Sequence, residues 1–588
     1  MNQESRICQN CKQSFTIEPE DFNFYAKIGV PPPTWCPPCR FQRRAVFRNE
    51  RKLFRREDGR TKKTLLSLYP PESGYTVYHD TDWWNADVWD PLSYGKDFDP
   101  SRPFLLQLFE LDRRVPKMHA DTINMVNSDY SANAADLKNC YLLFNSNYSE
   151  DCAYGNGIDL SKNCYDNSHV QKSERCYGSF WLTHCYETHF SSQCEDCVSV
   201  WFSKNCRGCQ NCFGCVNLRA KKYCIFNEQY SKEEYEKRVV AMNFQAWSGF
   251  STARKQTKEF WLAFPNKCIQ GVQNTNVSGE YITHSKNIKK SYLIRESEDL
   301  AYVQYSQVPS SRDCMDSTII GAKAELFYEC ATSGWGSAHL KFCVECWSGG
   351  RELEYCIFCS RNAANLFGCV GILEHQYCIL NKQYSKEDYI KLRERIIKHM
   401  NDMPYVDKRG KVYRYGEFLP PEFSPFAYNQ TIAPEHFPLT KDEAMAFGCR
   451  WQDPNPSEYQ TTMAAADIPD AVTDAKDDIL KEVIQCSECK RAYRVIQPEL
   501  QFLRQIKIPL PRSCVDCRHR ARIAERNRSK IYPRQCGCAG TGSDNGVYEN
   551  TASHRHGENH CEERFETSYP PDSPCIVYCE PCYQAEVV

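Results

Sequence analysis

The sequence contains no run of about 18 consecutive apolar residues, and this absence argues against a membrane-spanning helix. Its start, MNQESRICQNCKQSF, lacks the apolar core of a secretory signal, so we expect a cytoplasmic protein. The formal net charge is only −2, so any surface for nucleic acid must be local. No Walker, Rossmann or His-Glu-x-x-His motif is present, and no catalytic residue is predicted.

Cysteine, in contrast, is abundant, with 36 among 588 residues. A reducing cytoplasm disfavours disulfides, and many of these cysteines stand in Cys-x-x-Cys pairs. We therefore predict that the paired cysteines bind metal. A disulfide-rich secreted protein is the alternative.

Two modules at opposite ends of the chain share one cysteine spacing, in which 24 residues separate two Cys-x-x-Cys pairs. An offset of 478 residues also places Phe24 on Phe502 and Pro31 on Pro509, which indicates an internal duplication. Two such knuckles supply four thiolates to one tetrahedral ion and leave no open coordination position, so we predict structural zinc ribbons. The predicted ligands are Cys8, Cys11, Cys36 and Cys39 in the first ribbon and Cys486, Cys489, Cys514 and Cys517 in the second.

A basic run without proline or glycine follows each ribbon and is predicted to be a helix. Its cationic residues recur every fourth position in both copies and would form a stripe along one helix face. Because uncompensated like charges destabilise a helix, their retention favours an anionic partner such as a phosphate backbone, with a solvated charged face as the alternative. The predicted nucleic-acid-binding residues are Arg40, Arg44, Arg48, Lys52, Arg518, Arg522, Arg526 and Lys530.

A second duplicated segment follows each basic run, with LSLYPPESGYTVYHDTDWW resembling ETSYPPDSPCIVYCEPCYQ at an offset of 500 residues. The later copy holds a Cys-x-x-Cys knuckle and 22 extra residues that carry three histidines. The earlier copy has Asp58, His79 and Asp82 at the ligand positions, so we expect it to have lost the site. The preferred metal ligands are Cys536, Cys538, Cys579 and Cys582, with Cys561 or one of His554, His556 and His560 as substitutes.

The middle of the chain repeats short units such as LKNCYLLF and SKNCYDNS, with cysteines at a period of 12 and then 9 residues. A second array follows, with a cysteine period of 13. Units of this kind favour a β-solenoid, in which we expect two units to form one rung of roughly 18 to 26 residues. Each array ends at a serine, Ser231 or Ser385, that can cap a helix.

The stretch NCRGCQNCFGCVN places cysteines at every third residue, which raises the question of an iron–sulfur cluster. The second array replaces Cys212 by Leu366, so we interpret most array cysteines as buried filler. Two sets of paired cysteines survive the duplication and could bind zinc between neighbouring units, although a plain cysteine ladder would show the same period. They are Cys194, Cys197, Cys206 and Cys209, and Cys343, Cys346, Cys356 and Cys359.

These patterns predict a multidomain, mainly β protein, with zinc ribbons at both termini flanking two cysteine-rich β-solenoid arrays and connecting helices. The expected domains are a zinc ribbon with basic helix (1–57), a degenerate second ribbon and linker (58–129), solenoid array 1 (130–228), a helical connector (229–280), solenoid array 2 (281–381), a helix (382–404), a proline-rich and acidic linker (405–475), a C-terminal ribbon with basic helix (476–532) and a second Cys/His zinc module (533–588).

The motif CQNCKQSF followed by VPPPTWCPPCR resembles a widespread bacterial probable zinc-ribbon domain. The whole order of segments resembles large uncharacterised proteins of ultra-small-genome candidate-phylum bacteria, through WWNADVWDPLSYGKDFDPSRPF, YGEFLPPEFSPFAYNQT, DDILKEVIQCSECKRAYR and IVYCEPCYQAEV. This resemblance covers nearly the full chain. It implies a bacterial zinc-ribbon protein and implies no activity.

Three function classes follow. The leading hypothesis is a scaffold with three Zn²⁺ sites, or five if the array cysteines bind, that holds RNA, DNA or a ribonucleoprotein through its arginine faces. The alternative is a protein-interaction or self-assembly module in which those arginines meet acidic protein surface or the chain's own acidic linker. An iron–sulfur or glycan-active enzyme has the least support, and no membrane partner is expected. For Trp83, Trp84 and Trp89, core packing is favoured over stacking on a partner.

Overall fold

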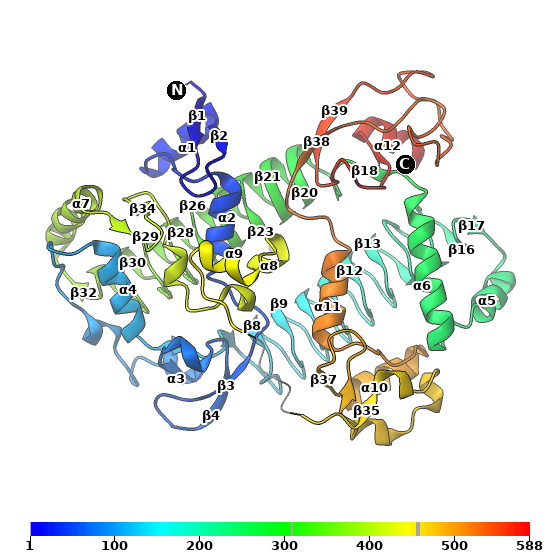
Figure 1. The fold of residues 1–588 in the computed structure, drawn as a ribbon, viewed down its shortest axis with the longest axis horizontal. Helices are drawn as coiled ribbons and strands as arrows, with labels where there is room; N and C mark the ends of the chain where they lie inside the picture. Colours follow the sequence, from blue (N-terminus) through cyan, green and yellow to red (C-terminus); the bar gives the residue numbers. More distant parts are fainter. Residues whose placement is uncertain (1, 307–309, 454–458, 588) are drawn as a thin grey trace. The chain divides into compact units, whose positions relative to one another are not determined.

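The computed structural model describes residues 2–306, 310–453 and 459–587. The chain forms many strands and two compact units, each built from segments far apart in the sequence (Figure 1). The first unit comprises Met1–Ala120, Ile269–Asp453 and Arg528–Ile531, and the second comprises Asp121–Cys268, Pro454–Asn527 and Tyr532–Val588. The N-terminal ribbon therefore shares a unit with the second array, and the C-terminal ribbon shares one with the first array.

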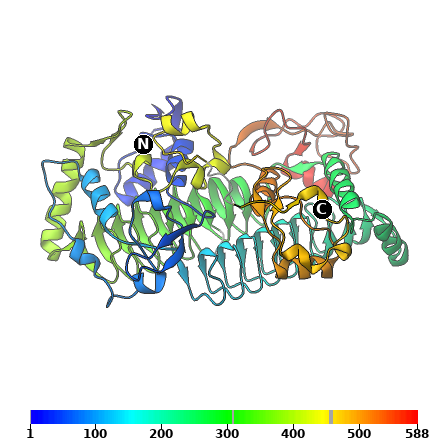
Figure 2. The same ribbon diagram turned by 60° about the horizontal axis from the view of Figure 1, so that its bottom comes forward.

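The first array, in the second unit, consists of short strands in two sheets, and within each sheet the strands follow chain order (Figure 2). All neighbouring strands are parallel except the last two, which form an antiparallel pair. Asn156 pairs with Ser168 and Ser168 with Phe180, so the chain returns to the same position after 12 residues. We call each such repeat a coil. The strands are β7 (Thr122–Ile123), β8 (Ala132–Ala135), β9 (Phe144–Asn147), β10 (Asn156–Asp159), β11 (Ser168–Gln171), β12 (Phe180–Thr183), β13 (Ser192–Glu195), β14 (Val198–Trp201), β15 (Gln210–Phe213), β16 (Lys222–Ile225) and β17 (Glu228–Gln229).

The 12-residue register shows that one repeat unit forms one coil, so the expectation of two units per rung is wrong. Every third residue has a positive φ, which turns the chain and sends the next side chain inward. In one coil the turning residues are Asn205, Gly208, Asn211 and Gly214, and asparagine and glycine tolerate this conformation. The residues that follow them, Cys206, Cys209, Cys212 and Cys215, are all fully buried.

The inward thiols form hydrogen bonds with the main chain of their own and the next coil. Cys164 Sγ donates to the carbonyl of Lys162 at 3.4 Å and lies 3.6 Å from that of Ser173. Ser161 Oγ makes the same bond to the carbonyl two residues earlier, that of Asp159, at 2.8 Å. A small side chain with one donor therefore suits an inward position, which explains why serine and cysteine alternate there.

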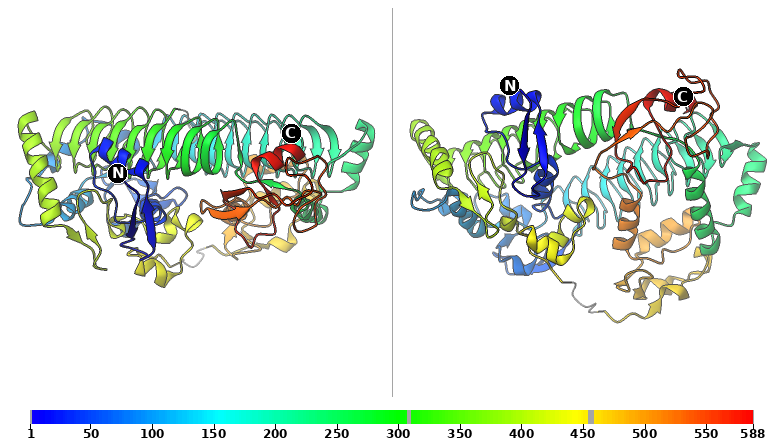
Figure 3. Two further views of the ribbon diagram at one scale, coloured as in Figure 1. Left: turned by 90° about the horizontal axis from the view of Figure 1, so that it is seen from above. Right: turned by 45° about the horizontal axis from the view of Figure 1, so that its top comes forward.

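The second array, in the first unit, repeats this plan with coils of 11 to 14 residues (Figure 3). Its outer face carries aromatic residues such as Tyr328 and Tyr355, which pack against neighbouring elements. The strands are β19 (Gly271–Val272), β20 (Thr275–Thr283), β21 (Lys286–Arg295), β22 (Glu298–Ala301), β23 (Gln304–Ser306), β24 (Arg312–Met315), β25 (Thr318–Ile320), β26 (Glu325–Tyr328), β27 (Ala331–Ser333), β28 (Ala338–Lys341), β29 (Arg351–Glu354), β30 (Ala364–Phe367), β31 (Gln376–Ile379) and β32 (Lys382–Gln383).

Helices follow the two arrays, and the serines predicted to cap them do so. Ser231 Oγ accepts the amide of Glu234 at 3.2 Å and Ser385 Oγ accepts that of Asp388 at 3.1 Å. These helices are α5 (Lys232–Ala241) and α7 (Lys386–Asp402), and α6 (Trp247–Leu262) follows α5. Among the described residues, no helix is long and apolar enough to cross a membrane.

Each ribbon consists of a β-hairpin and two short helices. The N-terminal ribbon has β1 (Glu4–Ile7), β2 (Ser14–Ile17), α1 (Pro19–Ile28) and α2 (Pro37–Ala45). The C-terminal ribbon has β36 (Ile484–Gln485), β37 (Ala492–Tyr493), α10 (Gln497–Ile506) and α11 (Val515–Ala524). The predicted long basic helices are therefore wrong in length, because α2 ends at Ala45 and α11 at Ala524.

The duplicated segment after each ribbon also keeps one fold. In the first unit it has β3 (Phe54–Glu57), β4 (Thr64–Ser67), β5 (Val77–Tyr78) and α3 (Asp80–Trp83), with α4 (Phe104–Arg114) and β6 (Lys117–Met118) after it. In the second unit it has β38 (Tyr532–Gln535), β39 (Arg564–Thr567), β40 (Val577–Tyr578) and α12 (Glu580–Val587). There β40 pairs with β18 (Asn266–Lys267).

The linker after α7 packs along the array of the first unit. Tyr415 donates from its hydroxyl to Glu354 at 2.8 Å, and the Gly416 amide donates to the hydroxyl of Tyr355 at 3.0 Å. Its elements in this unit are β33 (Tyr405–Val406), β34 (Val412–Tyr413), η3 (Pro421–Phe423), η4 (Tyr428–Gln430), α8 (Ala433–His436) and α9 (Lys441–Ala446).

Candidate metal centres

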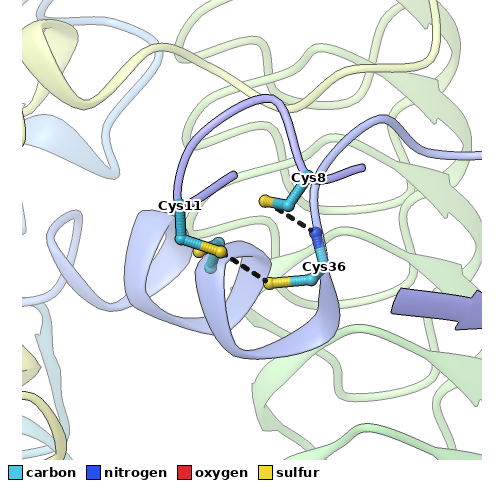
Figure 4. A group of neighbouring side chains, drawn as sticks. Cys8, Cys11 and Cys36 are labelled. Atoms are coloured by element: carbon cyan, nitrogen blue, oxygen red, sulfur yellow. Dashed lines mark hydrogen bonds between the residues drawn. The ribbon is translucent and has the colours of Figure 1, made fainter. Parts of the chain in front are cut away.

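The N-terminal ribbon brings its four predicted cysteine ligands together, with all four sulfurs within 4.8 Å of one another. Cys8 and Cys11 come from the turn of the β1–β2 hairpin, and Cys36 and Cys39 from the start of α2. Cys11 Sγ lies 3.7 Å from Cys36 Sγ, and the Cys36 amide donates to Cys8 Sγ at 3.2 Å (Figure 4). A main-chain amide directed at a sulfur favours its thiolate form, which is the form that binds metal.

The C-terminal ribbon repeats this geometry. Cys489 Sγ lies 3.6 Å from Cys514 Sγ, and the Cys514 amide donates to Cys486 Sγ at 3.2 Å. Burial alone would raise the pKa of Cys489, but hydrogen bonds from the amide of Arg491 and from Cys517 lower it to about 6. Both ribbons therefore offer four convergent sulfurs that could hold a metal ion, as predicted. Because each set is complete with four thiolates, the arrangement suits a structural ion.

The C-terminal module contains two further groups of convergent ligands. One group is Cys536, Cys561, Cys579 and Cys582, and the other is Cys538, His554, His556 and Cys582. Seven of the eight predicted ligands, all except His560, fall in these groups. They are divided between two groups, whereas the prediction was one site. The ring of His560 instead lies 3.0 Å from the carbonyl of Cys561 through Nδ1. The hydrogen bond between Cys579 and Cys536 lowers the pKa of the Cys579 thiol to about 5, which favours a thiolate ligand.

The equivalent segment of the first unit keeps the backbone of this module and fills the ligand positions differently. The His79 amide donates to Asp58 Oδ2 at 3.1 Å, as the Cys579 amide donates to Cys536 Sγ at 3.2 Å. Arg60, at the position of Cys538, forms an ion pair with Asp82 at 2.6 Å. The carboxylate of Asp58, the Arg60–Asp82 pair and His79 thus occupy the places of the four cysteines.

The eight array cysteines predicted to bind zinc are not assembled into metal groups. Within residues 2–306, 310–453 and 459–587, no array cysteine belongs to a group of three or more metal-ligating atoms within 4.8 Å of one another. Their sulfurs make main-chain hydrogen bonds instead, as Cys197 does to the carbonyl of Cys206 at 3.3 Å and Cys343 to that of Leu353 at 3.4 Å. The prediction of zinc at these positions is therefore corrected for both sets, which are Cys194, Cys197, Cys206 and Cys209, and Cys343, Cys346, Cys356 and Cys359.

The arginine face of the N-terminal ribbon is buried against the second array. Arg40 Nη2 lies 2.6 Å from Asp316, and Arg44 Nη1 lies 3.0 Å from Glu329. Arg48 Nη1 lies 2.9 Å from Glu345. The three arginines are at most 3% exposed, so no phosphate backbone can reach them in this fold.

Arg43, which the sequence pattern did not predict, joins three parts of the first unit. Its Nη2 lies 2.7 Å from Glu329 of the array, and its Nη1 lies 2.7 Å from Glu417 of the linker. Its guanidinium also stacks over Trp35, 4.5 Å from the ring centre. Arg43 does not belong to the four-residue period, because Ala521 stands at its place in the second copy, and the period alone could not identify it.

The arginine face of the C-terminal ribbon meets the first array in the same way. Arg522 Nη1 lies 2.5 Å from Asp166 and Arg518 Nε lies 3.1 Å from it. Arg518 Nη1 also lies 2.8 Å from Glu499 of the ribbon itself. Burial alone would raise the pKa of Asp166, but the charges of Arg518 and Arg522 outweigh it and lower that pKa.

These contacts correct the role predicted for the stripe. Of its eight members, Arg40, Arg44, Arg48, Arg522 and Arg526 are buried, and Arg518 has 12% of its side chain exposed. Lys52 is partly buried, and only Lys530 is exposed. The arginines therefore pair with acids of the arrays inside each unit, and the alternative of an acidic partner protein remains a prediction. Nucleic-acid binding elsewhere on the chain stays a prediction.

The tryptophans favoured as core residues are largely buried. Trp83 is 1% and Trp89 is 9% exposed, and Trp83 donates from its ring nitrogen to the carbonyl of Pro116 at 3.0 Å. Trp84 lies under the guanidinium of Arg361, 4.9 Å from the ring centre.

No protein-family model matches this sequence, and neither does any curated protein.

Proposed function

We propose that this protein is a zinc-stabilised scaffold that assembles with a protein partner, and that each of its two arrays of short strands is a β-solenoid. Zinc would fix the hairpin and helices of each ribbon and so present a preformed arginine face to the array. The observation that carries the proposal is the burial of those arginines in ion pairs with Asp316, Glu329 and Glu345 in one unit and with Asp166 in the other. The ribbons thereby act as internal clamps.

Zinc is the ion that this donor chemistry favours. Four convergent cysteine sulfurs, or two cysteines with two histidines, are its usual structural ligands, and the sets leave no open position for a substrate. Such sites contribute directly to folding free energy, since the ligands converge only in the folded chain.

A protein partner is favoured over nucleic acid by the exposed surface of the first array. There Lys138 and Lys162 flank Glu150 at 2.7 and 3.3 Å, so that their charges are already paired. Tyr148 and Leu160, 12 residues apart on neighbouring coils, are 50% and 54% exposed. Exposed apolar side chains at adjacent positions fit a protein surface better than a phosphate backbone.

The test is gentle purification of the full chain without chelator, followed by zinc analysis, the 260/280 nm absorbance ratio and size measurement. We expect zinc at the ribbon sites, a 260/280 ratio of protein alone, and a stable complex with a protein or with a second copy of the chain. The variant Tyr148→Lys with Leu160→Lys should lose that complex and keep its zinc. Co-purifying RNA or DNA that resists this variant would contradict the proposal.

A further inference from the structure

The two ligand groups of the C-terminal module share one residue, Cys582. We propose that this module binds two zinc ions bridged by the thiolate of Cys582. The first ion would take Cys536, Cys561, Cys579 and Cys582, and the second would take Cys538, His554, His556 and Cys582. The inference does not depend on the partner proposed above.

The ligand spacing fits two tetrahedral ions. Cys561 Sγ lies 3.9 Å from Cys579 Sγ, and His556 Nε2 lies 3.3 Å from Cys582 Sγ. Zinc–ligand bonds of about 2.3 Å to sulfur and 2.0 to 2.1 Å to nitrogen imply ligand separations of about 3.8 Å for two sulfurs and about 3.5 Å for sulfur and nitrogen. The observed separations match these values within a few tenths of an ångström.

Both histidines are oriented by hydrogen bonds on the nitrogen that would not bind metal. His556 Nδ1 lies 2.7 Å from the carbonyl of Asn559, which requires a proton on Nδ1 and leaves the lone pair of Nε2 facing Cys582. His554 Nε2 lies 2.8 Å from Glu586 Oε1, which leaves Nδ1 for the metal. Histidines that bind zinc usually donate their other ring nitrogen to a carboxylate or carbonyl in this way.

Glu586 is itself held in place as the partner of His554. It lies on α12 one turn after Cys582 and accepts the amide and hydroxyl of Thr551 at 2.8 and 2.9 Å, together with the amide of Ala552 at 3.2 Å. The side chains of His554 and Glu586 are 1% and 0% exposed. A buried histidine–carboxylate pair with this many donors to the carboxylate fixes the ring that faces Cys538 and Cys582.

One ion cannot use this set of ligands. A single tetrahedral zinc takes four ligands, whereas seven buried or half-buried side chains converge here, and one ion in either group would leave three of them without metal. Five thiolates and two divalent ions leave one net negative charge. Two amide donors offset part of it, since Asn550 Nδ2 donates to Cys538 Sγ at 3.2 Å and the Cys579 amide donates to Cys536 Sγ at 3.2 Å.

The duplication explains where the second set of ligands comes from. The chain between the paired strands β3 and β4 is Asp58–Lys63, whereas between β38 and β39 it is Cys536–Glu563. The longer loop carries Cys561, His554 and His556. The ends of both loops are closed by the same main-chain bonds, from Asp58 to Lys63 at 2.8 Å and from Cys536 to Glu563 at 2.9 Å. The extra residues thus extend a common frame into a larger metal centre.

The test is ¹¹³Cd NMR of the full chain reconstituted with ¹¹³Cd²⁺, together with zinc counting on the native protein. We expect four ions per chain, one for each ribbon and two for this module, and two of the four resonances should split each other through the shared sulfur. The variant His556→Gln should lose one ion and abolish that splitting. His560→Gln is the matched control, because His560 lies beside the site and outside both groups, and it should keep four ions and the splitting.

Three ions per chain in the native protein would overturn the proposal. Four resonances without mutual splitting would overturn the bridge, and splitting that persists in His556→Gln would show that this histidine is not a ligand of the second ion. None of these outcomes bears on partner binding, so failure of the binuclear centre and failure of the scaffold function are distinguishable.

Discussion

Arg40 and Asp316 meet through a hydrogen bond of 2.6 Å between Nη2 and Oδ2, although 276 residues separate them in the chain. Their counterparts in the other unit, Arg518 and Asp166, lie 3.1 Å apart. The duplication therefore preserved a contact between a ribbon and an array that are not neighbours in sequence. This contact assigns the duplicated arginine period to assembly within each unit.

Replacing Arg40 by alanine should destabilise the first unit strongly. Its removal leaves Asp316 buried at 0% exposure with its nearest cation, Arg44, at 3.7 Å, and breaking a buried pair costs about 3 to 5 kcal/mol. Denaturant unfolding followed by circular dichroism measures the loss.

The matched control for this variant is Arg312→Ala on the same array. Arg312 pairs with Glu325 at 2.8 Å, but their side chains are 61% and 38% exposed, so its loss should cost about 1 kcal/mol or less. Equal losses in the two variants would show that the buried pair carries no special weight.

Acid should weaken the clamp of the second unit through Asp166. Arg518 and Arg522 lower the pKa of Asp166 below its ordinary value of about 3.9, against the opposing effect of burial. A lowered pKa in the folded state stabilises the fold fully above that ordinary value, and the stabilisation is lost as pH falls through the folded pKa. The free-energy difference between the wild type and Asp166→Asn should therefore be constant from pH 5 to 7 and shrink below about pH 4. A difference that grows with acid would contradict this sign.

Serine should replace an array cysteine far better than a ribbon cysteine. Cys176 Sγ donates to the carbonyl of Glu174 at 3.5 Å, and serine makes the equivalent bond at other inward positions. We expect Cys176→Ser to cost about 1 kcal/mol and to leave the zinc content unchanged. Cys486→Ser should lose one ion per chain, because it removes one of four ligands. Zinc loss in Cys176→Ser would assign that cysteine to a metal site after all.

The segment β3 to α3, which has Asp58 at the place of Cys536, should depend on this carboxylate for stability. This carboxylate accepts the amides of Arg60, Thr61 and His79 at 2.7, 3.0 and 3.1 Å. Asp58→Ala leaves all three without their acceptor and should cost about 1 to 3 kcal/mol. Asp82→Ala, which breaks only the half-exposed pair with Arg60, should cost about 1 kcal/mol or less. Thermal unfolding of the two variants gives the comparison, and a larger loss for Asp82→Ala would reverse this assignment.

Local spacing made the convergent cysteines of the ribbons, which could hold a metal ion, predictable, because two residues between cysteines define a knuckle wherever it occurs. The repeat of the arrays was visible for a similar reason, since the 12-residue cysteine period became the register of strands such as β10 and β11. The number of units per coil was not visible, because it depends on a left-handed residue at every third position. Nothing in the spacing of NCRGCQNCFGCVN reveals that its four cysteines point inward from one coil.

Contacts between distant segments were beyond the sequence. Arginine at every fourth position suggested a charged helix face. The sequence could not show that Asp316 or Asp166 forms ion pairs with that face, because neither acid differs from the other polar residues of the arrays in its sequence pattern. The predicted length of the basic helix was wrong for a related reason. Residues after α2, such as Arg48, make contacts with distant parts of the unit and do not continue the helix that their intrinsic propensity favours. Similarly, the C-terminal cysteines and histidines were identified as a set, whereas their division around Cys582 is a property of the folded loop.

Hydrogen–deuterium exchange of the full chain, with metal bound and after chelation, measures whether bound metal holds the ribbon helices against the arrays. We expect the amides of α2 and α11 to exchange slowly when metal is bound and to exchange rapidly once it is removed, while the inner strands of the arrays stay protected. Rapid exchange of both helices in the metal-bound chain would show that the ribbons are not held against the arrays, and that metal does not fix their arginine faces.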